Sequence, residues 1–426
     1  MKKQTVLTGI TTTGTPHIGN YLGAIKPAIE ASQNSNLNSY FFLADFHALI
    51  KCHDPERVAR STREIAATWL ALGLDTDKAT FYRQTDIPEI TELTWILTCM
   101  TSKGLMNRSH AYKASVDVNR EAGKQDDDDV TMGLFSYPIL MAADILMFNA
   151  DIIPVGKDQI QHIEMARDIA GRFNHTYGTL FNLPEAQVDE QTQLIPGLDG
   201  RKMSKSYDNT LPLFCSSDEL YKLIKQIKTD ALEPGQPKDA DSSTIFQLFA
   251  NFANEAEQTE MRSKFENGIG WGEAKKELFE YLDSYLSGPR QEYNKLMQDM
   301  AYVEQHLHKG AEKARSHAAP FMEQIRIAAG IRPLTYQPMA QQPTEKKETE
   351  KSAEQIARAE EGRRRAILMQ LKPLLERIEA AQDKAAEAKQ LVAEKEQEIA
   401  GLKKKAKQKA QNELDLLRGE LADLLA

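Results

Sequence analysis

Cysteine is scarce in this chain. The three cysteines in 426 residues, Cys52, Cys99 and Cys215, are widely separated and include no Cys-x-x-Cys pair, which argues against a zinc or iron–sulfur site and against a disulfide-stapled secreted fold. Long apolar runs are missing too: none approaches the roughly 18 residues of a membrane span, and the N-terminus leads into a strand pattern without a signal peptide. These absences predict a reducing, cytoplasmic location and no membrane contact.

The chain also lacks the positive charge excess common among nucleic-acid-binding proteins. Its formal net charge is −9 at pH 7. Residues 351–426 are nearly balanced, with 16 basic and 14 acidic side chains, so the net negative charge belongs to the first 350 residues. Because phosphate contacts are local, a small basic patch is enough to bind RNA, but composition alone does not suggest such a partner.

The hydrophobic pattern changes character near residue 206. Before it, strand-like runs alternate with helical stretches such as 55–72 and 138–148, the pattern of a parallel sheet covered by helices. The strand-like runs are 4–9, 40–46, 79–84 and 151–155. After it we expect only helices, at 218–228, 243–252, 258–266, 271–286 and 289–309. The predicted fold class is α/β: a Rossmann-like parallel sheet domain, 1–206, followed by an all-helical domain, 207–309, with a helix at 310–330 packing back on the sheet.

The remaining residues predict a linker and a helical extension. Residues 331–353 are rich in Pro, Gln, Glu, Lys and Thr, as linkers are. From 354 to 426, apolar residues recur three or four positions apart, with one longer step between Val392 and Ile399, which predicts a coiled-coil-like helix. That apolar seam consists of Ile367, Leu371, Leu374, Ile378, Ala381, Ala385, Ala388, Val392, Ile399, Leu402, Ala406, Ala410, Leu414, Leu417, Leu421 and Leu424. The basic run Lys403–Lys409 within it is either a solvated helix face or a nonspecific RNA-capturing patch.

Two short motifs point to the chemistry. His17-Ile-Gly-Asn20 follows a strand and a Gly-containing loop and begins a helix, where free backbone N–H groups bind phosphates and Gly19 permits close approach. Far along the chain, Lys202-Met-Ser-Lys-Ser206 carries two ammonium groups three residues apart in a loop that can close over a triphosphate. Alone, each has an ordinary explanation, a helix-end histidine or a solvated loop charge. Together they predict ATP handling.

This pair resembles the two ATP signatures of class I aminoacyl-tRNA synthetases, and residues 5–330 resemble one family of that class, the tryptophanyl-tRNA synthetases. The strings that carry the resemblance are Gly19-Asn-Tyr-Leu-Gly-Ala24, Ala44-Asp-Phe-His-Ala-Leu49, Met141-Ala-Ala-Asp-Ile-Leu146, Asp151-Ile-Ile-Pro-Val-Gly-Lys-Asp-Gln159 and Gln161-His-Ile-Glu-Met-Ala-Arg-Asp168. The resemblance implies ATP-dependent attachment of L-tryptophan to tRNA(Trp) through a tryptophanyl-adenylate. It also implies Mg²⁺ on the ATP, a homodimer, and an anticodon-binding role for the helical domain.

By the same resemblance, catalysis rests on His17, Asn20, Lys202 and Lys205. The further residues implied for ATP are Thr11, Thr12, Thr13, Gly19, Lys113, Gly156, Lys157, Asp158, Ile195, Met203, Ser204 and Ser206. Many family members have Gln-Pro-Ser-Gly where this chain has Thr11-Thr-Thr-Gly14. A threonine hydroxyl can still bond phosphate or carboxylate. This departure therefore leaves the exact role of the loop open, but it does not change the predicted reaction. We expect no resident metal site in the protein, which is usual for Mg²⁺ bound to a nucleotide.

For tryptophan, the resemblance assigns Asp144 to the indole N–H. A carboxylate in the apolar stretch 138–148 needs a partner, and a ligand without the matching N–H would leave it unpaired. The alternative is a purely structural role, as a buried aspartate that caps a neighbouring helix. The resemblance further implies Tyr137 and Gln159 for the substrate's ammonium group. It implies Met141, Ile153, Val155 and His47 around its side chain.

Three rival interpretations stay open at this point. The sister enzyme for tyrosine shares both ATP motifs, as would another nucleotidyltransferase. A non-catalytic, synthetase-like RNA-binding or scaffolding protein would make the extension the functional part. The acidic run Asp126–Asp129 is predicted to be an exposed loop, with metal binding as the weaker alternative.

Overall fold

The computed structural model describes residues 3–188, 195–331, 364, 367–369, 371–400 and 404–425. The chain divides into two compact units, residues 1–337 and 338–426. None of the described helices combines the length and apolar character that a membrane crossing requires.

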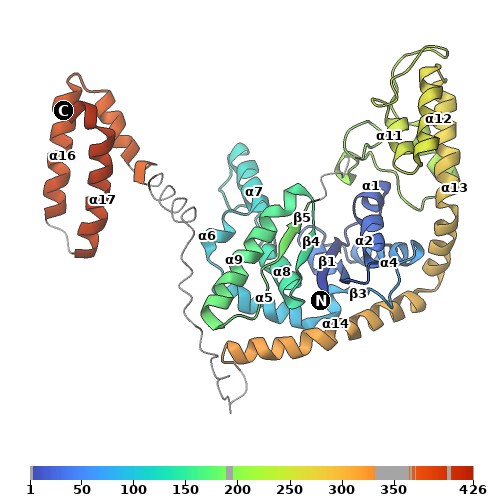
Figure 1. The fold of residues 1–426 in the computed structure, drawn as a ribbon, viewed down its shortest axis with the longest axis horizontal. Helices are drawn as coiled ribbons and strands as arrows, with labels where there is room; N and C mark the ends of the chain where they lie inside the picture. The colour runs from blue at the N-terminus through green and yellow to red at the C-terminus, as the bar shows by residue number, and fades with distance from the viewer. Residues whose placement is uncertain are drawn as a thin grey trace. The chain divides into compact units, whose positions relative to one another are not determined.

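A parallel sheet forms the centre of the first unit (Figure 1). Its described strands are β1 (Gln4–Thr11), β2 (Leu37–Ala44), β3 (Thr80–Arg83), β4 (Ile152–Pro154) and β5 (Glu185–Gln187). All pair in parallel, in the order β3-β2-β1-β4-β5. The chain therefore builds outward from β1 in one direction and then, from β4, in the other. Ligands bind at such a switch point, beyond the carboxyl ends of the two strands.

The two faces of the sheet are covered by different helices, because alternate strand residues point to opposite sides. On one face Phe41, Leu43 and Phe81 join a core with Trp69. On the other, Phe42 and Tyr82 pack with the apolar faces of several helices. The helices of the sheet region are α1 (Ile18–Asn20), α2 (Lys26–Ser32), α3 (Asp45–Ala48), α4 (Pro55–Ala71), α5 (Pro88–Met100), α6 (Lys103–Met106), α7 (His110–Glu121), α8 (Met132–Met147) and α9 (Ile160–Tyr177). The predicted α/β class is confirmed.

Two predicted helices differ in detail from the structure. The helix after His17 is interrupted by a wider π turn, η1 (Tyr21–Ile25), between α1 and α2. The prediction that a helix begins near Pro138 is wrong: α8 begins at Met132, where the Thr131 hydroxyl caps it by accepting the Leu134 N–H, and Pro138 lies inside. The acidic run Asp126–Asp129 is exposed as expected, with Asp126 paired to Arg120 and Asp129 paired to Lys124.

The region after residue 206 is helical as predicted, but its last two helices are longer than expected. It consists of α10 (Ser217–Lys225), α11 (Thr244–Ala250), α12 (Glu255–Glu266), α13 (Trp271–Gln298) and α14 (Met300–Ala328). The breaks expected at 287–288 and at Gly310 do not exist; α13 runs through Pro289 and α14 through Gly310. Gly310 is where α14 crosses β3: a Cβ there would lie 1.6 Å from the Phe81 carbonyl oxygen. The glycine reflects close packing and not a helix end.

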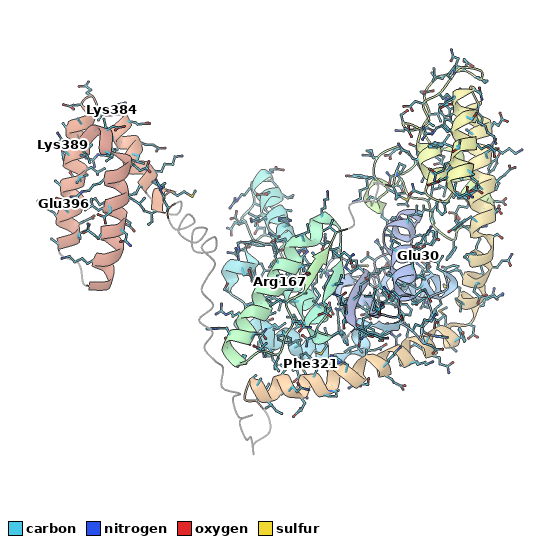
Figure 2. All side chains as sticks on the ribbon, in the orientation of Figure 1. Glu30, Arg167, Phe321, Lys384, Lys389 and Glu396 are labelled. Atoms are coloured by element: carbon cyan, nitrogen blue, oxygen red, sulfur yellow. The ribbon has the colours of Figure 1, made fainter. Side chains whose placement is uncertain are left out.

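The second unit has its own core. Residues 371–379 are helical and are followed by α16 (Lys384–Ala400), α17 (Lys404–Glu420) and α18 (Ala422–Leu425). Seam residues Leu371, Ile378, Ala388, Leu417 and Leu421 are buried against one another, while Lys384, Lys389 and Glu396 lie exposed on α16 (Figure 2). The predicted seam therefore closes within the chain, as a helical hairpin and not as one continuous helix. The predicted linker falls almost wholly outside the described residues, as do most side chains of the basic run.

Candidate active site

The loop that follows β1 is held in place by one face of α4. The Gly14 N–H donates to Ser61 Oγ at 2.8 Å, Arg57 Nε donates to the Thr13 carbonyl oxygen at 3.0 Å, and Thr15 Oγ1 donates to Glu64 Oε2 at 2.7 Å. Positions 57, 61 and 64 share one helix face. The loop at the switch point is thus shaped before any ligand arrives.

The three loop threonines are not equivalent. Thr11 is exposed and Thr13 half-buried, whereas Thr12 is fully buried. Its hydroxyl has no hydrogen-bond partner among the described residues and does not reach the surface. Thr12 therefore supports the loop from beneath, and the other two are the ones that can face a nucleotide.

His17 and Asn20 form a reciprocal cap at the start of α1. The Asn20 N–H donates to His17 Nδ1 at 3.3 Å, and the His17 N–H donates to Asn20 Oδ1 at 3.1 Å. Burial, and next the positive charge of Lys205, lower the pKa of His17 to about 4. The imidazole is therefore neutral at physiological pH and contributes as a hydrogen-bonding group and not as a cation.

The first motif contacts both the Lys202–Ser206 motif and the strand-like segment that follows it. The Ile18 N–H donates to the Leu211 carbonyl oxygen at 2.9 Å, and the Leu213 N–H donates to the Pro16 carbonyl oxygen at 3.0 Å. The Gly19 N–H points at Met203 Sδ, 3.3 Å away. A Cβ at position 19 would lie 3.1 Å from the His17 ring and 3.5 Å from Met203 Sδ, so glycine leaves room for this close packing.

The Lys202–Ser206 loop is organised around one buried amide, Asn209. Its Oδ1 accepts the Ser204 N–H at 2.8 Å, and its Nδ2 donates to Asp199 at 2.7 Å and to the Lys202 carbonyl oxygen at 3.1 Å. The Met203 N–H donates to the carbonyl oxygen of Ile195 at 2.8 Å. These bonds fix the backbone that carries both lysines.

The two lysines of that loop lie differently. Lys205 reaches over the loop after β1: a Cβ on Gly14 would lie 2.8 Å from Lys205 Nζ. Burial and the nearby Arg57 lower the pKa of Lys205, and Glu64 opposes the shift. Lys202 is exposed. The structure therefore brings Lys205, but not yet the Lys202 side chain, to the first motif.

A second set of predicted nucleotide residues lies at the end of β4. Gly156 and Lys157 are exposed just beyond the strand, and η3 (Lys157–Gln159) leads into α9. The side chains of Asp158 and Ser206 lie outside the described part of the chain. This is the other side of the β1/β4 switch point, where a ribose is expected.

Asp144 lies on α8 and is 1% exposed. His47 Nε2 is 2.9 Å from one of its oxygens, and Gln84 Nε2 donates to both, at 2.8 and 2.9 Å. Burial raises the pKa of this carboxyl, and hydrogen bonds from His47 and Gln84 oppose that rise. Asp144 accepts hydrogen bonds from two side chains of other elements. It does not cap a helix, so the alternative of a helix-capping aspartate does not apply.

The apolar residues predicted around it have the expected character. Ile153 is buried on β4, and Met141 and Val155 are half-buried against the same core. They can belong to the core and still present one side to a ligand.

Tyr137 and Gln159 are joined by a histidine. Tyr137 Oη lies 2.8 Å from His162 Nε2, and His162 Nδ1 lies 2.8 Å from Gln159 Oε1. Burial raises the pKa of Tyr137, and the Ser109 hydroxyl works against that shift. The two residues predicted to hold an ammonium group are therefore coupled.

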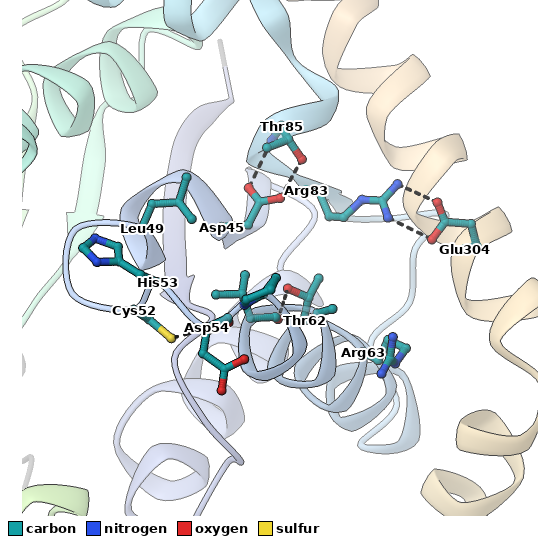
Figure 3. Close-up of a pocket in the computed structure, with 13 residues that line it drawn as sticks. Asp45, Leu49, Cys52, His53, Asp54, Thr62, Arg63, Arg83, Thr85 and Glu304 are labelled. Atoms are coloured by element: carbon teal, nitrogen blue, oxygen red, sulfur yellow. Dashed lines mark hydrogen bonds and ion pairs between the residues drawn. The ribbon is translucent and has the colours of Figure 1, made fainter.

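A separate hollow of about 520 Å³ lies between α3, α4, β3 and α14 (Figure 3). Leu49, Cys52 and Val58 are among its apolar lining, and Arg83, bonded to Glu304, closes its rim. Among the described residues, none of those predicted for ATP or tryptophan lines it. It is not part of the site.

Some placements could not be found from the sequence. Lys113 lies exposed on α7, and nothing in the described residues ties it to the other nucleotide residues. Gln84, His162 and Asn209 were missed although each is buried and bonded to the site. The only signal was their position: Gln84 ends a strand-like run, and His162 lies inside a quoted string.

Comparisons with known proteins identify the family to which this fold belongs. The family described as tRNA synthetases class I (W and Y) matches residues 1–319. The chain is 58% identical over 330 residues to the tryptophan–tRNA ligase of Pseudomonas syringae, a match that covers 77% of this chain and 74% of that one. It is 55% identical over 335 residues to that of Neisseria meningitidis, covering 78% of this chain and all of that one.

Among solved structures, the fold is similar to tryptophanyl-tRNA synthetase from Campylobacter jejuni complexed with ADP and tryptophan. That similarity has a TM-score of 0.71 and 41% identity, and it covers 77% of this chain and 100% of the other. A tyrosyl-tRNA synthetase from Archaeoglobus fulgidus, at 18% identity and a TM-score of 0.51, shares the fold alone. The chain belongs to the tryptophan–tRNA ligase family of class I tRNA synthetases.

Proposed function

We propose that this chain attaches L-tryptophan to tRNA(Trp) in two steps. ATP and tryptophan first give tryptophanyl-adenylate and pyrophosphate; the tryptophanyl group then passes to the tRNA and AMP leaves. The observation that carries the proposal is the pair of motifs at one switch point, with Lys205 over the loop after β1. Asp144 adds a buried carboxylate held by His47 and Gln84.

For activation, we assign phosphate binding to the His17–Asn20 helix start and to the two lysines. The tryptophan carboxylate attacks the α-phosphorus, and negative charge moves onto the leaving pyrophosphate. Preorganised donors aimed at that charge are the largest contribution such a site can make. What supports the assignment is that His17 is neutral and Lys205 already faces the loop. Closure of the Lys202 side chain is the remaining movement.

Mg²⁺ is proposed to arrive with ATP as part of the substrate. Within the described residues, no group of three or more His, Cys, Asp or Glu side chains could hold a metal ion. The predicted nucleotide site instead offers backbone N–H groups and lysines. That donor set suits phosphate oxygens and leaves the cation to the triphosphate.

Tryptophan is favoured over tyrosine by the chemistry around Asp144. We assign the indole N–H to this carboxylate, the side chain to Met141, Ile153 and Val155, and the ammonium group to Tyr137 and Gln159. The Pseudomonas and Neisseria relatives, between 55 and 59% identical to this chain, are tryptophan–tRNA ligases, which supports the same choice. We also propose a cytoplasmic location, and the three free thiols support it.

We also propose a homodimer, with the anticodon bound by residues 207–309. Support for self-association comes from exposed side chains of α5: Trp95 is 69% exposed, with Thr91 and Cys99 one turn to either side. Exposed aromatics of this kind mark interfaces. Light scattering should give twice the chain mass, and Trp95→Glu should give monomers. A monomeric parent chain would contradict the dimer.

The first test is amino-acid-dependent ATP–pyrophosphate exchange, with the full chain compared with a version ending at Gly330. We expect exchange with tryptophan and not with tyrosine. Equal rates in the two versions are expected because the match to the Neisseria relative takes in all of that protein within 335 residues. No exchange by the folded full chain would leave the non-catalytic, RNA-binding rival as the better account.

A further inference from the structure

A buried histidine joins the two side chains assigned to the ammonium group. His162, on α9, is 4% exposed. Its Nε2 lies 2.8 Å from Tyr137 Oη on α8, and its Nδ1 lies 2.8 Å from Gln159 Oε1. The imidazole and phenol rings meet edge to face, with centroids 5.3 Å apart. Both ring nitrogens of His162 are thus directed at the two predicted ligand-binding groups.

The chemistry of imidazole restricts how these bonds can be made. A neutral imidazole has one donor nitrogen and one acceptor nitrogen. Gln159 presents its carbonyl oxygen, which only accepts, so Nδ1 carries the proton and Nε2 accepts the Tyr137 O–H. In the other tautomer, Nδ1 and Gln159 Oε1 would face each other as two acceptors. The hydrogen-bond chain therefore runs from Tyr137 through His162 to Gln159.

This direction matters for a cationic ligand. With its proton committed to His162, the Tyr137 oxygen presents lone pairs to the pocket, and the Gln159 amide is held with its oxygen as the acceptor. An ammonium group has three donors and no acceptor, so it needs oxygens in this state. If the phenol proton pointed outward instead, it would oppose the ligand's positive charge.

We propose that His162 is a positioning residue that orients Tyr137 and Gln159 as acceptors for the ammonium group of the amino acid. The inference rests on the proposed function, since it concerns how that site holds tryptophan. His162 does not itself touch the ligand. The rival explanation is a histidine that only fills space between α8 and α9, and the two differ in whether the ligand's ammonium group matters.

The test compares L-tryptophan with indole-3-propionate, which has the same ring and carboxylate but no ammonium group. Both are titrated calorimetrically into the full chain and into His162→Phe, which keeps a ring and loses both hydrogen bonds. The variant should bind tryptophan roughly tenfold more weakly, because bonds to a charged group are lost, and indole-3-propionate within about twofold of the parent chain. His175→Phe, an exposed position on the same helix, is the matched control and should leave both affinities unchanged.

Two further variants separate orientation from packing. In a Tyr137→Phe background, His162→Phe should cost clearly less tryptophan affinity than it does alone, because part of its effect acts through the phenol. His162→Gln, whose amide oxygen can still accept the Tyr137 O–H, should fall between the parent chain and His162→Phe. In the exchange assay, KM for tryptophan should rise while KM for ATP stays constant.

Equal losses of both ligands in His162→Phe and His162→Gln would show that the histidine only packs, and would overturn the inference. Unchanged tryptophan affinity would overturn it as well. Failure of the proposed function has a different signature: the parent chain itself would bind no tryptophan and show no tryptophan-dependent exchange.

Discussion

Replacing Asp144 by asparagine changes one charge and one acceptor at the predicted indole site while keeping the side-chain shape. In the structure His47 Nε2 and Gln84 Nε2 both lie within 2.9 Å of the carboxylate oxygens. Gln84 can only donate from that nitrogen, so an amide in the same space must turn its oxygen toward Gln84. Its NH₂ group then occupies the second position, and an indole N–H finds no charged acceptor there.

The expected loss follows from that exchange. A hydrogen bond to a charged group contributes about 1.5–3 kcal/mol, and each 1.4 kcal/mol or so is a factor of ten in affinity. The Kd for tryptophan should therefore rise roughly 10- to 100-fold in Asp144→Asn. Stability should change much less, by about 1 kcal/mol or under, because losing a buried charge offsets the poorer fit to Gln84. Burial already raises the pKa of this carboxyl, which marks the cost of keeping it charged.

The assay uses L-tryptophan and its benzothiophene analogue, in which sulfur replaces the indole N–H. The parent chain should bind tryptophan much more tightly than the analogue, and Asp144→Asn should bind the two about equally. Asp168→Asn, whose side chain is 64% exposed on α9, is the control and should discriminate like the parent chain. If Asp144→Asn kept the full preference for tryptophan, the carboxylate would not read the indole N–H and the assignment would be wrong.

Three further changes test other parts of the structure. Lys205→Ala should slow tryptophan activation in single-turnover measurements about 100-fold while leaving the calorimetric Kd for tryptophan within twofold; equal losses in both would contradict its role at the phosphates. His17 has its pKa lowered to about 4, so the unfolded chain binds the extra proton first as pH falls below about 6.5, and stability is lost down to about pH 4. Between pH 7 and 4.5 the parent chain should lose roughly 2 kcal/mol more unfolding free energy than His17→Gln in urea titrations, and parallel losses would refute the neutral, buried imidazole. Gly310→Ala should destabilise the first unit by about 3 kcal/mol or more in thermal melts, because its Cβ would overlap the Phe81 carbonyl oxygen. The control Gly288→Ala, whose Cβ would meet nothing within 4 Å, should stabilise the unit by about 0.5–1 kcal/mol in the same melts.

Local patterns were enough to predict four of the five described strands and most helices, because strand and helix periodicities are written in neighbouring residues. The short edge strand β5 was missed. They were not enough to predict where helices end. Pro138 and Gly310 are local helix breakers, yet both lie inside helices. Packing overrides the local preference at these positions: α14 crosses β3 so closely that only glycine fits at 310.

The C-terminal extension shows a second limit of prediction from local patterns. Its apolar spacing was correctly identified, but spacing says only that a helix face needs covering and not what covers it. In the structure the covering surface is the chain itself, since Leu391 of α16 and Leu417 of α17 share one buried core. The ion pair between Glu396 and Arg418 joins the same two helices. A periodicity thus cannot distinguish a self-closing hairpin from a coiled coil between chains.

The site residues that could not be predicted from the sequence are those that hold other site residues in position. Asp144 was proposed because the family resemblance assigns it and because a carboxylate in an apolar stretch needs a partner, whereas Gln84, its partner 60 positions away, has an ordinary place at a strand end. Asn209 ties down the Lys202–Ser206 loop and is likewise unremarkable in the sequence. Such groups act through hydrogen-bond direction: an amide or imidazole sets which face of its neighbour donates and which accepts. Because direction depends on distances across the fold, motif chemistry can be read from the sequence, but the orientation that makes the chemistry selective requires the structure.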